Sequence, residues 1–159
     1  MLIGEMRDLE TVESALKIAE TGHLTFGTLH TNSTSQTINR IIDIFPAGQQ
    51  GQIRTQLSLV LEGIVCQALL PKIGGGRVAA REILLTIPAV SNLIREGKTF
   101  QIPSVMQTSK GMGMVTMNDA LLTLVKDRII EPREAWTKAT DKTGLSGMLK
   151  NAGLPTQFS

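Results

Sequence analysis

The sequence has 159 residues, of which 42% are apolar and 19% are charged, so its length and composition are those of about one globular domain with one hydrophobic core. The charges are interspersed and sum to only +2, and there is a single cysteine, Cys66. These values exclude an extended basic surface for nucleic acid, an internal disulfide framework and a four-cysteine zinc site. Because no apolar run approaches ~18 residues, we expect no direct insertion into a membrane.

The first half of the chain predicts short strands that alternate with amphipathic helices. Met1, Leu2 and Ile3 form an apolar segment shorter than the roughly 4–8 residues of a buried strand, so we expect either a very short strand or one whose beginning lies upstream. Asp8 is expected to cap a helix that ends near Thr21. Residues 23–29 are short and partly β-branched or aromatic, which favours a second strand.

The next segments predict two helices and a hairpin. A polar turn over residues 31–35 precedes a helix that ends at Pro46. A longer helix is then expected because apolar residues recur at helical spacing, namely Ile53, Leu57, Val60, Leu61 and Ile64. Residues 69–73 and 77–85 flank three glycines, 74–76, and are expected to form a β-hairpin.

The remainder of the chain is predicted to be helical. Pro88 begins a short helix that ends at Gly97, whereas residues 99–113 show no clear period. A capping pattern at residues 116–119 begins another helix, and further helical pieces are expected around 131–139 and 144–150. Strands mixed with more numerous helices favour the α/β class, followed by a small helical C-terminal part.

Glu5 is the first candidate for chemistry, because it directly follows the apolar segment and precedes a helix. A carboxylate at the C-terminal edge of a strand lies where open α/β sheets bind ligands. It could hold Mg²⁺ through water or polarise an attacking water. The alternative is purely structural, with Asp8 as a helix cap and Glu5 paired with Arg7 on the surface.

The two histidines, His23 and His30, are the second candidates. If both lay in one strand, their odd separation would place them on opposite faces, ~23 Å apart at ~3.3 Å per residue, so they are poor partners for one metal ion. His30 nevertheless falls at the predicted end of the strand, next to Thr28 and Thr31. An imidazole and hydroxyls at that edge could bind a phosphate. Each histidine could equally be an ordinary hydrogen-bonded residue.

Two segments imitate phosphate-binding loops without qualifying as such. Gly97-Lys98-Thr99 matches the end of the pattern G-x-x-x-x-G-K-[ST], but the first glycine would have to be residue 92, which is asparagine. The three glycines at 74–76 are followed by Arg77 instead of Lys-Ser or Lys-Thr. These residues therefore contain no loop that could hold a triphosphate.

Two separate motifs resemble those of the secretion-type P-loop ATPases. Residues 2–11 (LIGEMRDLET) resemble that family's unusual Walker B region, and residues 19–31 (AETGHLTFGTLHT) resemble its histidine box. The likeness extends over nearly the whole chain, becoming weaker after about Trp136, and is greatest to the branch that powers type IV pilus retraction. The single cysteine also favours this branch over the extension branch, which usually carries a four-cysteine zinc module.

The resemblance implies a role for individual residues. Glu5 matches the Walker B acidic residue linked to Mg²⁺ and the hydrolytic water, and His23 and His30 match the two histidines beside the nucleotide. Gly4, Thr28 and Thr31 are expected near the nucleotide phosphates. The implied cofactors are ATP and Mg²⁺, bound only together with a Walker A region that these residues lack, so the chain alone is expected to be inactive.

The resemblance also implies architecture and partners. Residues 1–86 would be the second half of a RecA-like ATPase core, and residues 87–159 a helical C-terminal subdomain. The intact protein would be a hexameric ring that contacts the inner-membrane platform protein of the pilus, in the cytoplasm at the bacterial inner membrane. Residues 89–96 match a motif associated with retraction, but Val90 and Ser91 replace the usual Ile-Arg, which removes one positive charge.

Two other interpretations remain open at this point. One is a non-catalytic binding or regulatory module that associates with pilus or secretion motor rings. The other is a metal-binding module that uses His23 and His30, which the strand geometry disfavours.

Overall fold

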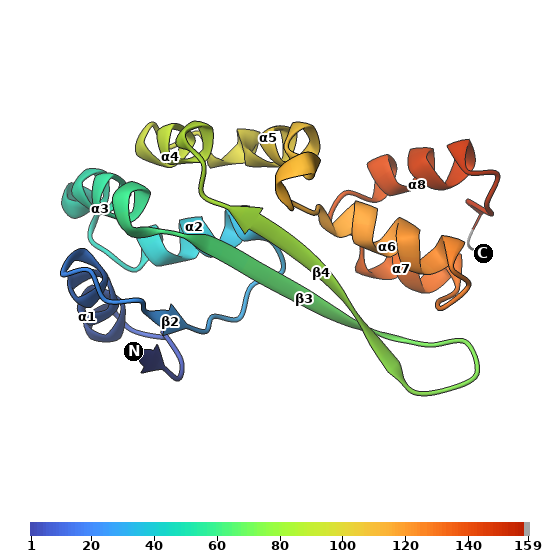
Figure 1. Cartoon of the computed structure of the whole chain (residues 1–159), viewed down its shortest axis with the longest axis horizontal. Coiled ribbons are helices and arrows are strands. Elements are labelled where there is room, and N and C mark those ends of the chain that lie inside the picture. Colours follow the sequence, from blue (N-terminus) through green and yellow to red (C-terminus); the bar gives the residue numbers. More distant parts are fainter. Residues whose placement is uncertain (158–159) are drawn as a thin grey trace.

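The computed structural model describes residues 1–157, and a long β-hairpin runs diagonally through it (Figure 1). Helices α1 to α3 lie near one end of the hairpin and α6 to α8 near the other (Figure 1). Within residues 1–157, no helix has both the length and the apolar character needed to cross a membrane.

The N-terminal segment forms two very short strands joined by a helix. Strand β1 (Leu2–Ile3) pairs in parallel with β2 (Phe26–Gly27), and α1 (Leu9–Glu20) connects them. The Asp8 side chain accepts a hydrogen bond from Thr11 N and caps α1, as predicted. The expected strand over residues 23–29 is wrong in its length. A ladder can extend only as far as its partner strand, and β1 has two residues.

Two further helices follow. Helix α2 (Thr34–Asp43) is capped by Ser33 and α3 (Ala47–Val60) begins directly after Pro46. The predicted extension of α3 through Ile64 is wrong, because strand β3 (Gly63–Pro71) already contains that residue. Ile64, Cys66 and Leu70 point inward at even spacing along β3, so the period is that of a strand.

The predicted hairpin is confirmed and is longer than expected. Strand β4 (Arg77–Leu85) pairs antiparallel with β3 from Pro71↔Arg77 to Gly63↔Leu85. The connecting glycines 74–76 all have positive φ, which a side chain would strain. In this register Cys66 lies opposite Glu82.

The C-terminal half is helical, as predicted. Pro88 and Thr116 begin helices at the expected residues, and the segment without a clear period contains one short α-helix between two 3-10 turns. The elements are α4 (Pro88–Arg95), η1 (Thr99–Gln101), α5 (Ile102–Thr108), η2 (Lys110–Met112), α6 (Met117–Lys126), α7 (Pro132–Lys138) and α8 (Lys142–Asn151).

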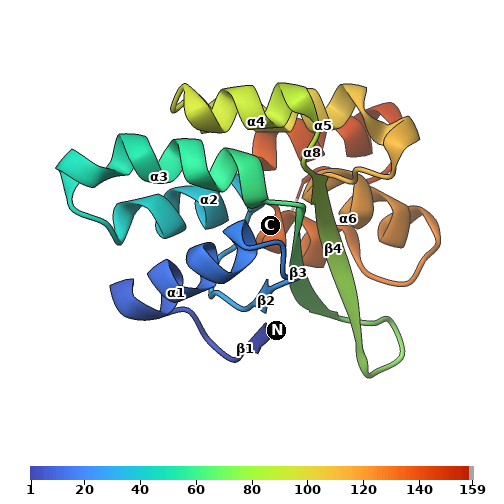
Figure 2. The same cartoon turned by 60° about the vertical axis from the view of Figure 1, so that its left-hand side comes forward.

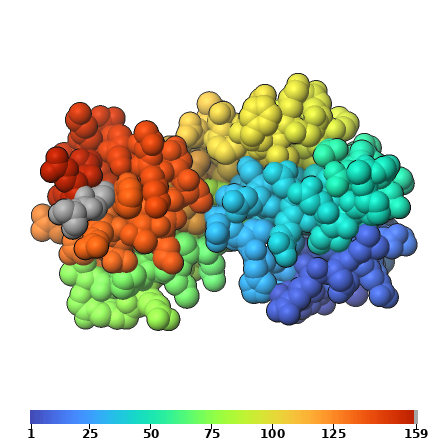
Figure 3. Space-filling view, turned by 180° about the vertical axis from the view of Figure 1, so that it is seen from behind, coloured from blue at the N-terminus to red at the C-terminus, as the bar shows by residue number. Residues whose placement is uncertain are grey.

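The buried apolar side chains form two clusters that share the hairpin. The first joins α1 to α5 with the inner positions of β3 and β4, and includes Ile38, Leu84 and Ile94. The second joins α6 to α8 with the turn end of the hairpin, and includes Leu70 and Leu121. Figure 2 shows α1 to α4 stacked beside the hairpin, and Figure 3 shows a hollow between the hairpin (green) and the N-terminal segments (blue and cyan).

Candidate active site

Glu5 and His30 meet at the C-terminal ends of the two short parallel strands. Glu5 follows β1 by two residues, and His30 follows β2 by three. Because the strands are parallel, the residues after them emerge at one edge, where α/β sheets bind ligands. Glu5 Oε1 lies 2.7 Å from His30 Nε2, so the structure brings together the carboxylate and the imidazole that the sequence singled out.

Backbone and hydroxyl contacts hold the two strand ends together. Met6 N donates to Thr28 O at 2.9 Å, and the Thr28 hydroxyl donates to Gly4 O. The Thr31 hydroxyl lies 2.7 Å from the Thr37 hydroxyl in α2. Gly4, Thr28 and Thr31 therefore all lie at this edge, and Thr31 joins it to the first turns of α2.

Arg7 is the third charged group of the site. Its guanidinium contacts the same oxygen, Glu5 Oε1, as predicted by the alternative in which Glu5 and Arg7 form a surface pair. Arg7 is the main cause that lowers the pKa of the Glu5 carboxyl; partial desolvation opposes this effect, and the nearby His30 adds to it. Glu5 is therefore a carboxylate near neutral pH.

His23 lies apart from this group. It precedes β2 instead of following it, and its exposed ring contacts the Thr21 hydroxyl, with Nδ1 and Oγ1 3.0 Å apart. The two histidines do not share a strand, since β2 covers only residues 26 and 27. The part of His23 in any chemistry stays a prediction.

The donor set suits one kind of metal ion. Within residues 1–157, no three His, Cys, Asp or Glu side chains form a group that could hold a metal by themselves. Mg²⁺ needs no such group, because it is commonly bound by one or two carboxylates together with waters and substrate phosphates. Both charge contacts of Glu5 run to Oε1, which leaves Oε2 as the oxygen that could bind a metal-coordinated water.

A polar groove begins at His30 and follows α2. Its volume is about 560 Å³, and its lining includes His30, Thr31, Asn32, Gln36, Asn39 and Arg40. The side chains of His30 and Arg7 are 81% and 73% exposed, respectively. The site can therefore be reached by a large polar ligand such as a nucleotide.

Glu82 is a polar residue near this region that no sequence motif singled out. Glu82 is 7% exposed and points inward from β4 between Ala80 and Leu84, both of which are buried and apolar. Residues two apart in a strand face the same side, so a glutamate at this position was the available signal.

The fold and the site define an α/β protein with a carboxylate and an imidazole at neighbouring tips of parallel strands. Residues 1–82 match the family described as "Type II/IV secretion system protein", and the chain belongs to this family.

Individual relatives agree with this assignment. The chain is 50% identical over 139 residues to the type IV pilus retraction ATPase PilT of Pseudomonas aeruginosa, covering 87% of this chain and 40% of that protein. It is 49% identical over 147 residues to a twitching motility protein of Neisseria gonorrhoeae, covering 92% of this chain and 39% of that protein.

A solved structure is also similar. The crystal structure of the pilus retraction motor PilT with bound ADP superposes with a TM-score of 0.84 at 53% identity, over 92% of this chain and 41% of that one. The predicted α/β class and the resemblance to secretion-type ATPases are thus confirmed. The chain spans about 40% of the length of these relatives.

Proposed function

We propose that this chain is the C-terminal part of an ATPase motor that powers type IV pilus retraction and twitching motility. The contact between Glu5 and His30 at the strand tips carries this proposal, because it places a carboxylate and an imidazole beside each other on an exposed polar edge. The names of the relatives supply the substrate and the process.

In this proposal Glu5 acts through its free oxygen. Arg7 and His30 hold Oε1 in place, so Oε2 can orient the water that attacks the terminal phosphate. Bound Mg²⁺ supplies charge neutralisation at the phosphates. His30 lies where it could contact a phosphate oxygen. Gly4, Thr28 and Thr31 lie beside it and hold the strand tips in place, because the Thr28 hydroxyl donates to Gly4 O and the Thr31 hydroxyl contacts Thr37.

The nucleotide itself needs a further binding element. A triphosphate is held by backbone N–H groups and a lysine of a P-loop, and the 159 residues contain no G-x-x-x-x-G-K-[ST] sequence. We therefore propose that the 159 residues alone do not hydrolyse ATP, and that the P-loop belongs to the part of the relatives that this chain does not match.

The wider setting is proposed on the same basis. Residues 1–86 would complete a RecA-like core and residues 87–159 would form its helical subdomain. The motor would assemble with copies of itself into a hexameric ring in the cytoplasm, at the inner-membrane platform of the pilus. Nothing in this proposal calls for nucleic acid or for insertion into the membrane.

The test is ATP turnover by a chimera in which this chain replaces the matching part of the Pseudomonas PilT relative. Glu5→Gln and His30→Ala should each lower kcat, and the loss for Glu5→Gln should be about 100-fold or more. Glu13→Gln is the matched control, because Glu13 is also an ion-paired glutamate, with Lys17, but lies on α1 away from the strand tips.

Two results would contradict the proposal. One is ATP turnover by the purified 159-residue chain, with contaminating ATPases excluded. The other is unchanged turnover in the Glu5→Gln chimera, which would favour a non-catalytic module that associates with motor rings.

A further inference from the structure

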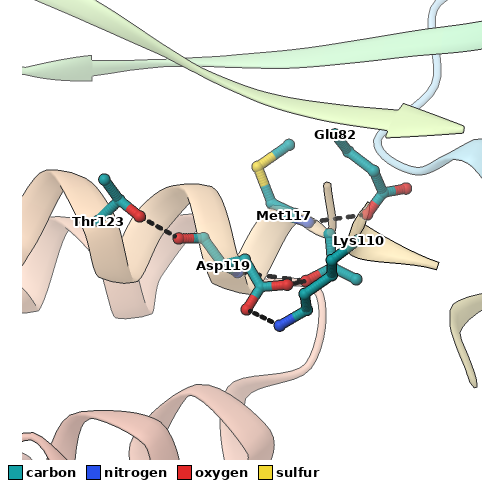
Figure 4. A network of polar contacts seen from close by, with 6 residues as sticks. Glu82, Lys110, Met117, Asp119 and Thr123 are labelled. Carbon is teal, nitrogen blue, oxygen red and sulfur yellow. Dashed lines mark hydrogen bonds and ion pairs between the residues drawn. The ribbon is translucent and has the colours of Figure 1, made fainter. Parts of the chain in front are cut away.

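Glu82 is the one buried charged side chain among residues 1–157. Lysine and arginine side chains in this part of the chain form no ion pair with it, and the nearby Lys110 pairs with Asp119 at 2.8 Å (Figure 4). A buried carboxylate needs several donors in place of water. The groups that donate to the Glu82 carboxylate therefore indicate its role.

Two helix N-termini compensate this charge, one from each half of the molecule. Glu82 Oε1 accepts from Thr34 N at 2.8 Å and from the Thr34 hydroxyl at 2.9 Å, at the start of α2. Glu82 Oε2 accepts from Met117 N at 3.1 Å, at the start of α6 (Figure 4). Free N–H groups and the helix dipole make each of these termini positive, so a single anion stabilises both.

The first turn of α2 also holds the loop that carries His30. The Thr31 hydroxyl contacts the Thr37 hydroxyl, which itself donates to Ser33 O at 2.9 Å. The Ser33 side chain accepts from Gln36 N at 3.2 Å and caps the helix. The loop and the first turn of α2 therefore form one hydrogen-bonded unit, and Glu82 joins that unit to α6.

We propose that Glu82 is a positioning residue that couples the His30 loop to the C-terminal helices, since one carboxylate fixes the first turns of both α2 and α6. The coupling is a property of these 159 residues. Its importance for nucleotide chemistry rests on the function proposed above.

A second buried polar contact of α2 provides a matched control. The Thr99 hydroxyl donates to Asn39 Oδ1 at 2.9 Å, and the Ser35 hydroxyl donates to Thr99 O at 3.2 Å, so η1 also contacts α2. Thr99 is 7% exposed, as Glu82 is, but it does not reach α6. Thr99→Val should therefore leave the coupling between α2 and α6 intact.

The experiment is a double-mutant cycle read by amide hydrogen exchange in the 159-residue chain, without nucleotide. Ser33→Ala removes the cap of α2, and the reporter is the Ala120 amide of α6, which donates to Thr116 O. The exchange rate of Ala120 is divided by that of the Leu145 amide in α8, so that an effect of global destabilisation on both amides cancels. The loss of one cap should raise this ratio about five-fold in the wild-type and Thr99→Val backgrounds.

In the Glu82→Gln background the same Ser33→Ala change should alter the ratio less than about two-fold, because a carboxamide cannot accept from both helices. Coupling is reciprocal, so Thr116→Ala should raise exchange at the Thr37 amide of α2 only while Glu82 is present. If Glu82→Gln does not fold, Thr34→Val serves in its place and should weaken the coupling.

Equal effects of Ser33→Ala at Ala120 with and without the Glu82 carboxylate would overturn the proposal, as would the absence of any effect in the wild type. Because no nucleotide is present, either outcome would leave the proposed ATPase function to its own test.

Discussion

The site at the strand tips and the junction at Glu82 both contain a glutamate, but the two glutamates are held in opposite ways. Glu5 is partly exposed and is contacted by two exposed side chains, Arg7 and His30. Glu82 is buried and accepts three hydrogen bonds from the starts of two helices. Exposed ion pairs contribute little to folding, whereas buried polar groups are costly to disrupt. Glu5 is therefore available to a ligand, whereas Glu82 is committed to the fold.

The largest expected effect is that of Glu82→Ala. This change leaves two backbone N–H groups without an acceptor, leaves the Thr34 hydroxyl only the weak acceptor Met106 Sδ at 3.6 Å, and opens a small cavity, so we expect a loss of about 3 kcal/mol in the free energy of unfolding. Urea unfolding measures it, with Glu62→Ala as the exposed control expected to stay within about 0.5 kcal/mol. If both variants unfold at the same urea concentration, the junction does not stabilise the fold.

A smaller effect is expected when one donor of the junction is removed. Thr34→Val keeps the buried volume but removes the hydroxyl that donates to Glu82, which should cost about 1 kcal/mol. Thr137→Val is the control, because the Thr137 hydroxyl also forms one hydrogen bond, to Arg133 O, but on the exposed surface of α7. A stability loss in the control as large as that in Thr34→Val would show that burial is not the cause.

At the strand tips we expect almost no effect on stability. The urea midpoints of Glu5→Gln and His30→Ala should be indistinguishable from that of the wild type, because the partners Arg7 and His30 are exposed and water can replace the contacts that are lost. Circular dichroism at increasing urea concentration measures this directly. A marked destabilisation by either variant would mean that the pair is structural and would weaken its assignment as a ligand site.

The last expected change is confined to one ionisable group and concerns the pKa of the Glu5 carboxyl. Arg7 lowers the pKa of the Glu5 carboxyl, so Arg7→Gln should raise that pKa toward its ordinary value, as measured by NMR of the carboxyl carbon. A carboxyl group whose pKa is lower in the folded than in the unfolded chain stabilises the fold at pH values above the ordinary pKa of glutamate. This stabilisation is lost as the pH falls through the lowered pKa. Lys17→Gln removes the other surface pair, with Glu13, and should leave the Glu5 titration unchanged.

Local patterns predicted the elements that depend on neighbouring residues. The cap at Asp8, the helix beginning at Thr116 and the glycine turn at 74–76 were all found where the sequence placed them. The proximity of Glu5 and His30 was also foreseeable, because parallel strands bring the residues after them to a common edge.

Elements that depend on distant partners were predicted less well. The strand around Phe26 is short because its partner is short, and α3 ends before Ile64 because that residue joins the hairpin. Ile64 fits both a helical and a strand period, and only pairing with Leu84 decides between them.

By itself, the order of residues determined the class of this protein, the helix starts and the pair of polar groups that follow two strands. These features follow from caps, turns and periodicity, which act over a few residues. The tertiary structure decided that Glu5 contacts His30 directly while His23 lies apart. It also decided that Thr34 and Met117 both bind the buried carboxylate of Glu82. Those contacts join residues up to 48 positions apart, and only the packing of helices on the hairpin brings them within hydrogen-bonding distance.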